Sequence, residues 1–128
     1  MQEVTSAIVA LIGLKVTISD RITKVKLLTK ELERALPAYN RSKGMVRAKF
    51  FDPCGSFTWY VMEYTKKDRV FFGFVTSSMC PEGEFGSFSL DELESVKGPL
   101  GLGIERDLYF TPKPIKDIQR TISEGQHV

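Results

Sequence analysis

Residues that build common catalytic and metal sites are scarce in this chain. Of its 128 residues, one is a histidine, His127, one residue from the end, and two are cysteines, Cys54 and Cys80. Histidine-based nucleophilic triads and histidine-rich metal sites are therefore not expected, and two cysteines do not make a four-cysteine zinc site. Without a histidine in the folded part of the chain, Cys54 is a poor candidate for a thiol nucleophile. We expect no cofactor, and the residues favour a non-enzymatic protein.

Long hydrophobic runs and phosphate-binding loops are also missing from the sequence. The apolar segment Ala7–Leu14 has no basic region before it, is followed at once by Lys15 and is too short to cross a bilayer. The glycine run from Gly98 to Gly103 lacks the Lys-Ser/Thr ending of a P-loop and the spacing of a dinucleotide fingerprint. One possible cysteine pair is no disulfide framework. These absences predict a cytoplasmic protein without a signal peptide, a membrane span or a membrane partner.

The composition is that of a soluble globular protein of one domain. Hydrophobic residues make up 42% of the chain and charged residues 27%, and a chain of this length can bury a core without disulfides or metal. Charge is uneven along the sequence, since residues 1–49 hold 10 Lys and Arg against 4 Asp and Glu, whereas residues 50–128 hold 8 against 12. Such polarity either steers a charged partner or simply solvates the surface.

We expect three parts along the chain. Residues 1–26 form an N-terminal extension whose apolar residues are spaced for one short amphipathic helix, residues 27–122 form a single α+β domain, and residues 123–128 form a polar tail. The extension can dock on the domain, mediate self-association or pack poorly. The sequence does not choose among these alternatives, and it does not give the oligomeric state.

Local signals predict an α+β fold, with an antiparallel sheet of about four to five strands and packed helices. Thr29 is placed to cap a helix that ends before Pro37, Ser89 begins a capping box, and a last helix is expected over residues 115–122. Short polar connections favour an antiparallel meander. The second strand should lie centrally, because both of its faces are largely apolar. The strands are expected at 45–51, 57–64, 70–76 and 84–88, with a further extended segment at 104–110.

Alternation along the strand at 45–51 predicts a charged face. Arg47, Lys49 and Phe51 are expected to share it, opposite Val46, Ala48 and Phe50. Aromatic residues of neighbouring strands, Tyr60 or Phe72, can join the cations in a surface of the kind that binds single-stranded nucleic acid. The alternative is that these aromatic residues belong to the core, as is usual in a small sheet.

A charged triplet, Glu105-Arg106-Asp107, lies in the extended segment. Glu105 and Asp107 are expected on one face, where two carboxylates can help to hold a divalent cation or act in acid-base chemistry, with Glu63 or Asp52 as a third group if folding brings it near. The interpretation that we favour is structural, with Arg106 tying the segment down and the carboxylates as its exposed partners.

Distinctive blocks of residues are spread over most of the chain, namely Leu27-Leu-Thr-Lys-Glu-Leu, Ala48-Lys-Phe-Phe-Asp-Pro, Thr58-Trp-Tyr, Phe71-Phe-Gly-Phe-Val, Gly86-Ser-Phe-Ser-Leu-Asp-Glu-Leu-Glu, Gly98-Pro-Leu-Gly-Leu and Ile104-Glu-Arg-Asp-Leu-Tyr-Phe. In this order they resemble a bacterial family of unknown function, small proteins often carried by plasmids, phages and integrated elements. The resemblance covers about residues 27–115, and residues 1–26 precede the point at which such proteins usually begin. It implies an accessory role, such as binding a host defence component or handling transferred DNA, and it implies no catalytic residue.

Together these patterns predict a non-enzymatic binding module of a mobile element, with a protein as its partner. The alternatives are a single-stranded nucleic-acid-binding protein and a metal-assisted hydrolase that uses Glu105 and Asp107. If Trp59 belongs to the core, its substitution will unfold the domain rather than weaken binding. The residues predicted to bind are Arg47, Lys49, Trp59, Glu105, Arg106 and Asp107.

Overall fold

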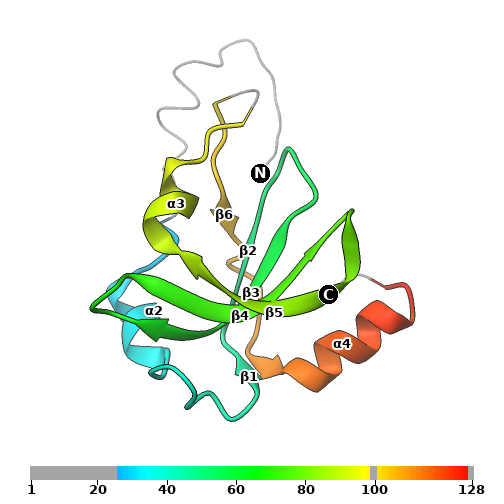
Figure 1. The fold of residues 1–128 in the computed structure, drawn as a ribbon, viewed down its shortest axis with the longest axis horizontal. Coiled ribbons are helices and arrows are strands. Elements are labelled where there is room, and N and C mark those ends of the chain that lie inside the picture. The colour runs from blue at the N-terminus through cyan, green and yellow to red at the C-terminus, as the bar shows by residue number, and fades with distance from the viewer. Residues whose placement is uncertain (1–25, 99–100, 127–128) are drawn as a thin grey trace.

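The computed structural model describes residues 26–98 and 101–126, which form the α+β fold expected from the sequence (Figure 1). The sheet is antiparallel, has five strands in the order β5-β4-β3-β2-β6, and is accompanied by a small sheet of β1 and β7. The short helix expected in the N-terminal extension lies outside the described residues. The strands are β1 (Met45–Val46), β2 (Ala48–Phe51), β3 (Thr58–Thr65), β4 (Val70–Ser77), β5 (Cys80–Ser89), β6 (Glu105–Arg106) and β7 (Lys113–Pro114).

The helices begin and end close to the predicted positions. In α2 (Lys30–Ala35), Thr29 Oγ1 accepts the amide hydrogen of Leu32 at 3.1 Å, and the helix ends at Leu36, whose helical geometry Pro37 disfavours. In α3 (Leu90–Ser95), Ser89 Oγ accepts the amide hydrogen of Glu92 at 3.2 Å, as its capping box predicts. The last predicted helix is α4 (Ile115–Ser123).

β3 is the central strand of the sheet, as its apolar faces predict. Its consecutive residues Tyr60, Val61 and Met62 are 4%, 0% and 4% exposed. Val61 belongs to one core cluster, and Tyr60 and Met62 belong to the other. A strand with two apolar faces is buried only in a sheet that is covered on both sides.

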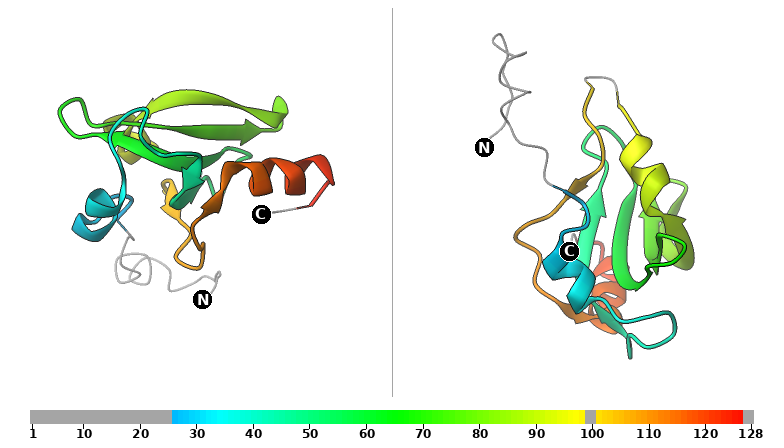
Figure 2. Two further views of the ribbon diagram at one scale, coloured as in Figure 1. Left: turned by 90° about the horizontal axis from the view of Figure 1, so that it is seen from below. Right: turned by 90° about the vertical axis from the view of Figure 1, so that its left-hand side faces the viewer.

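Two core clusters pack the helices against the sheet. The first joins Phe50 and Phe71 of the sheet to Leu32 of α2 and Leu93 of α3. The second joins residues of β1, β3 and β4 to α4, and α2 and α4 lie near opposite ends of the curved sheet (Figures 1 and 2). The main members of the second cluster are Val46, Tyr60, Met62, Phe74, Ile115 and Ile118.

The first predicted strand is interrupted at Arg47. Its amide hydrogen bonds to the carbonyl of Val61 at 2.9 Å, although Val61 is also the partner of Ala48, so two residues face one, as in a β-bulge. The predicted shared face of Val46 and Ala48 was therefore wrong, because these residues belong to different core clusters. Arg47 lies at the point where the buried side chains of this segment change from one core cluster to the other.

Glu63 is a buried carboxylate in β3. It is 4% exposed, and its two oxygens accept the amide hydrogens of Asn40 at 2.7 Å and Ser42 at 3.1 Å. Hydrogen bonds of this kind offset the cost of removing a charge from water. Glu63 thus fastens the loop between α2 and β1 to the sheet.

β5 forms one edge of the sheet and is longer than the predicted strand. It pairs with β4 from its last residue, Ser89, back to Cys80. The first half was missed because Pro81 and Gly83 are poor strand formers.

We predict that Gly73→Ala lowers the free energy of unfolding by about 3 kcal/mol. A Cβ at Gly73 would collide with the backbone carbonyl of Tyr60 on β3, which cannot move without disturbing the ladder. Gly86, directly opposite on β5, has open space around its Cβ position, so Gly86→Ala should be neutral or stabilising by up to about 1 kcal/mol. Urea unfolding followed by circular dichroism measures both, and equal losses would contradict the prediction.

Candidate binding site

The short strand β6 brings the charged triplet beside the strand β2. Arg106 lies in register with Phe50 and Glu105 with the next residue, so the two charged side chains point to opposite faces, as predicted. The amide of Asp107 then donates to the carbonyl of Lys49 at 2.9 Å. Lys49 Nζ also lies 3.8 Å from Asp107 Oδ2. Charged residues far apart in the sequence therefore meet at this edge.

The chain turns directly after β6, so the predicted extended segment at 104–110 was too long. Asp107 Oδ1 accepts the amide hydrogen of Tyr109 at 2.9 Å, and the amide of Phe110 donates to the carbonyl of Asp107 at 3.3 Å. We call residues 107–110 the β6 turn. These bonds hold the turn in a shape that leaves Leu108 57% and Tyr109 93% exposed.

A pocket with a volume of about 130 Å³ lies between α2 and the β6 turn. Two of its residues are cationic, Arg47 and Arg106, and two are acidic, Glu31 and Asp107. It lies at a junction of three segments, namely the start of α2, the bulge at Arg47 and the β6 turn. The other lining residues are Thr29, Leu32, Ala48, Leu108 and Phe110.

The two arginines of the pocket differ in their hydrogen bonds. Arg106 Nη1 donates to Thr29 Oγ1 at 3.4 Å, a long hydrogen bond to an oxygen that also caps α2. Arg47 Nε is buried and has no hydrogen-bond partner within the described residues. None of the ion pairs in this part of the chain includes either arginine. Arg106 therefore ties β6 to α2 through a hydrogen bond rather than through an ion pair.

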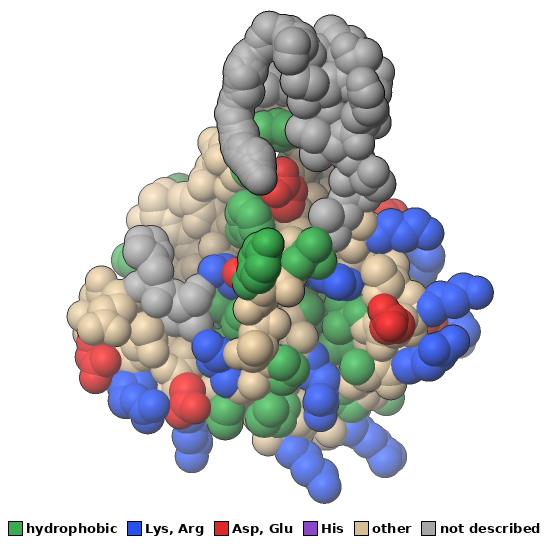
Figure 3. All heavy atoms as spheres, turned by 180° about the vertical axis from the view of Figure 1, so that it is seen from behind, with side chains coloured by type: hydrophobic (Ala, Val, Ile, Leu, Met, Phe, Trp, Pro, Cys, Tyr) green, Lys and Arg blue, Asp and Glu red, His purple; other side chains and the backbone are tan. Residues whose placement is uncertain are grey.

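The β6 turn lies on the rear side of the molecule as drawn in Figure 1, below the sheet in the left view of Figure 2. Figure 3 shows the molecule from this side. Lys and Arg side chains gather around its lower half, with hydrophobic side chains among them. The pocket is thus part of a face on which cationic and apolar groups are mixed.

Trp59 and Glu105 do not line the pocket. Trp59 is half-buried against the first core cluster and stacks on Phe57, with ring centroids 5.6 Å apart. In the sheet, Phe50 lies between Trp59 and Arg106. Glu105 points away from Arg106, and burial raises the pKa of its carboxyl. Of the six predicted residues, the structure brings four together, Arg47, Lys49, Arg106 and Asp107.

The carboxylates proposed as a metal site do not converge. Glu63 is occupied by two backbone amides, and Asp52 Oδ1 accepts the amide hydrogen of Cys54 at 3.0 Å in a surface turn. Within residues 26–98 and 101–126, no three His, Cys, Asp or Glu side chains are grouped so that they could hold a metal ion. The third ligand that the hydrolase hypothesis needs beside Glu105 and Asp107 is therefore not found in this part of the chain.

The sheet face proposed for nucleic acid is covered. Tyr60 is the register partner of Lys49, but its side chain is packed in the second core cluster against α4. Burial also raises the pKa of the Tyr60 hydroxyl. The alternative interpretation, that Tyr60 is a core residue, is the correct one.

Several site residues were not identified from the sequence. Thr29 was recognised only as a helix cap, and Tyr109 and Leu108 were assigned to an extended segment. An aspartate whose carboxylate accepts the amide hydrogen two residues later is a common turn pattern. Asp107 was therefore the one local signal of a turn at this position, and the prediction of an extended segment did not use it. The contact between Thr29 and Arg106 joins positions 77 apart, and no local pattern reports it.

Comparisons with known proteins identify a family but no function. The family model described as "Protein of unknown function (DUF2958)" matches residues 24–122. Neither the curated proteins nor the solved structures contain a match to this chain. No helix of the described residues has the length and apolar character needed to cross a membrane.

We predict that Glu105→Gln raises the melting temperature at about pH 7 and has little effect near pH 3.5. The folded pKa of Glu105 lies above its unfolded value because burial disfavours the charged form. The folded state therefore holds this proton more tightly, and stability is lost as the pH rises from the unfolded to the folded pKa. Thermal unfolding across this range measures the difference from wild type. Glu82→Gln, at an exposed position, is the control. A rise in the melting temperature of Glu105→Gln that is the same at every pH would contradict the prediction.

Proposed function

We propose that this chain, which belongs to the family of proteins of unknown function DUF2958, is a non-enzymatic binding protein whose partner is a protein. Its recognition surface consists of the β6 turn and the arginines beside it, Arg47 and Arg106. Lys49 supports this surface through its ion pair with Asp107.

The exposure of the β6 turn is the observation that carries this proposal. Tyr109 is 93% exposed and Leu108 57% exposed, next to two arginines. Tyr and Arg are the residue types that most often dominate the binding energy of protein interfaces. Isolated exposed hydrophobic residues are common on any surface, but here the exposed Tyr109 follows Leu108, which lines one pocket together with two arginines.

The turn is also held in place before any partner arrives. Its backbone is fixed by the two hydrogen bonds to Asp107, and Phe110 anchors its end in the second core cluster. Lys113 Nζ lies 5.3 Å from the centre of the Phe110 ring, a further contact at the same end. A fixed turn loses little conformational entropy on binding, which favours affinity.

The sequence resemblance supplies the setting of the proposal. Small proteins of plasmids, phages and integrated elements act on bacterial hosts, and the proposed partner is accordingly a bacterial protein, such as a component of host defence. The exposed turn supports a protein as the partner, because its residue types suit a protein interface. The bacterial origin of that protein comes from the resemblance alone.

A nucleic-acid partner is the second candidate, and one observation favours it. Arg47 and Arg106 line the pocket beside the β6 turn, and the same turn carries the exposed ring of Tyr109. Surfaces that combine cations with aromatic rings bind single strands. Glu31 and Asp107 in the same lining oppose it, because they repel a phosphate backbone. The protein partner is therefore preferred.

Site-specific cross-linking in a bacterial lysate tests the proposal. A photo-reactive amino acid replaces Tyr109 in the full chain, and a matched chain carries it in place of Met79, which is 87% exposed at the β4–β5 turn. The expected result is a defined protein adduct from position 109 that survives nuclease treatment and does not form from position 79. Adducts that are the same at both positions, or that disappear after nuclease treatment, would overturn the protein-binding proposal.

Competition by unlabelled protein measures the contribution of the turn. Wild-type chain should suppress the adduct, and Tyr109→Ser should compete roughly 30-fold less well, as expected for a truncated anchor worth about 2 kcal/mol. Because Tyr109 is almost fully exposed, the same change should alter the free energy of unfolding by about 0.5 kcal/mol or less. Met79→Ser is the matched control and should compete like wild type.

A further inference from the structure

We propose that the pocket between α2 and the β6 turn binds a single carboxylate group of the partner, between Arg47 and Arg106. This inference rests on the proposed function and adds the chemistry of the contact, an acidic side chain inserted beside the exposed turn.

The first argument is the unpaired donor in the pocket. Arg47 Nε is buried, carries part of a positive charge and has no acceptor within the described residues. Buried polar groups in folded proteins almost always have a partner, and a charged donor left without one is costly. Arg47 also lines the pocket, so a carboxylate bound there would lie beside the residue that carries this unpaired donor.

The second argument is the balance of charge. Asp107 is paired with Lys49, so the two arginines face one further carboxylate, that of Glu31. Glu31 lies exposed in the first turn of α2 and forms no ion pair with either arginine. Among the described residues that line or adjoin the pocket, Arg47, Arg106, Lys49, Glu31 and Asp107 together have an excess of one positive charge, which matches one carboxylate.

The third argument is size. Pockets for cofactors and other small molecules usually measure roughly 300–1,000 Å³, whereas this one measures about 130 Å³. A pocket of this volume suits the end of one side chain. The planar guanidinium group of arginine matches the two oxygens of a carboxylate.

Charge also distinguishes a carboxylate from the phosphates of nucleic acid. A phosphate backbone carries a row of negative charges, and the carboxylates of Glu31 and Asp107 in the pocket lining would repel them. A peptide segment with one acidic side chain brings a single charge and apolar neighbours that can contact Leu108 and Tyr109. The pocket therefore fits an acidic peptide better than a nucleic acid.

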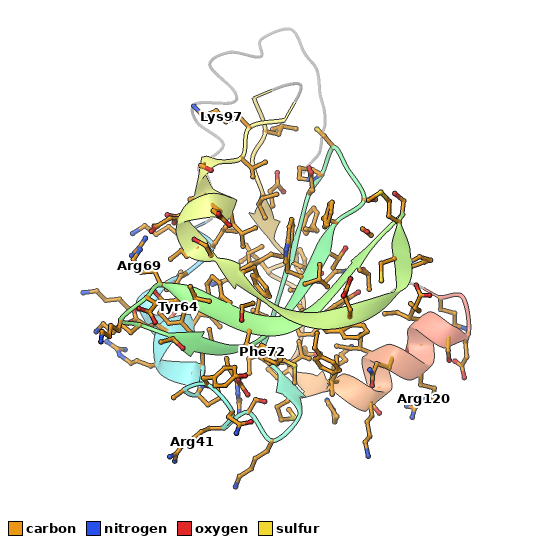
Figure 4. All side chains as sticks on the ribbon, in the orientation of Figure 1. Arg41, Tyr64, Arg69, Phe72, Lys97 and Arg120 are labelled. Carbon is orange, nitrogen blue, oxygen red and sulfur yellow. The ribbon has the colours of Figure 1, made fainter. Side chains whose placement is uncertain are left out.

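Titration with acetate, observed by NMR, tests the proposal directly. Sodium acetate serves as the carboxylate probe at constant ionic strength, and the signals followed are Arg47 Nε–H, Arg106 Nε–H and the amide of Leu108 in the full chain. These signals should shift in a saturable manner, while those of Arg41 and Arg120 should not. Arg41 and Arg120 lie away from the pocket, in the α2–β1 loop and on α4 (Figure 4). Shifts that are uniform over all arginines, or that do not saturate, would overturn the inference.

Variants assign the binding to Arg47. Arg47→Gln should weaken acetate binding about 10-fold or more, as loss of a charge-assisted hydrogen bond predicts, and Arg41→Gln should leave it unchanged. Arg47→Lys keeps the charge but not the planar guanidinium donor. It replaces Arg47→Gln in this test if Arg47→Gln does not fold, and it should also weaken acetate binding. Acetate binding that is unaffected by both Arg47 variants would contradict the proposal.

Two further probes separate the alternatives. The same titration is repeated with inorganic phosphate and with an oligothymidine. If either binds these residues more than about 10-fold tighter than acetate, the ligand of the pocket is a phosphate and the carboxylate inference is overturned. A protein adduct at position 109 together with a failed acetate titration would leave the proposed function intact and overturn this inference alone. Saturable acetate binding without any adduct would support the carboxylate site and overturn the proposed function.

Discussion

The burial of the sheet on both faces determines where charge can lie in this protein. In β3, Tyr60 and Val61 point to opposite faces, and both are almost fully buried. Neither face at the centre of the sheet is open to water, so charged side chains are stable only at the edges or with dedicated partners. Glu63 is the exception that has such partners, two backbone amides of one loop. The other charged residues of interest are confined to the edge formed by β2 and β6.

Because of this confinement, several charged side chains gather at one edge of the sheet. β6 is only two residues long, yet its pairing with β2 sets Arg106 near the start of α2 and Asp107 beside Lys49. The bulge at Arg47 places a third cation at the same junction. The two core clusters hold these segments from either side, and this rigidity is what a small recognition pocket requires.

Local chemistry made much of the fold predictable, and long-range packing made the rest unpredictable. Thr29 and Ser89 bond to amides three residues away, so their roles can be read from short stretches of sequence. The bulge at Arg47 depends on Val61 and on both core clusters, and strict alternation therefore misassigned Val46. For the candidate site, the charge pattern indicated segments 47–49 and 105–107, which the fold brings together. It did not reveal that Phe50 would separate Trp59 from Arg106, or that Glu105 would point away from the pocket.

The outer edge of β5 has a consequence for how copies of this protein meet. Among the described strands none pairs with that edge. Pro81 has no amide hydrogen to donate there, and the side chains of Glu82 and Glu84 are exposed. A second copy that added its own β5 would lose hydrogen bonds at the proline and bring like charges together. The sheet is thereby protected against growth into a fibre at its longest free edge.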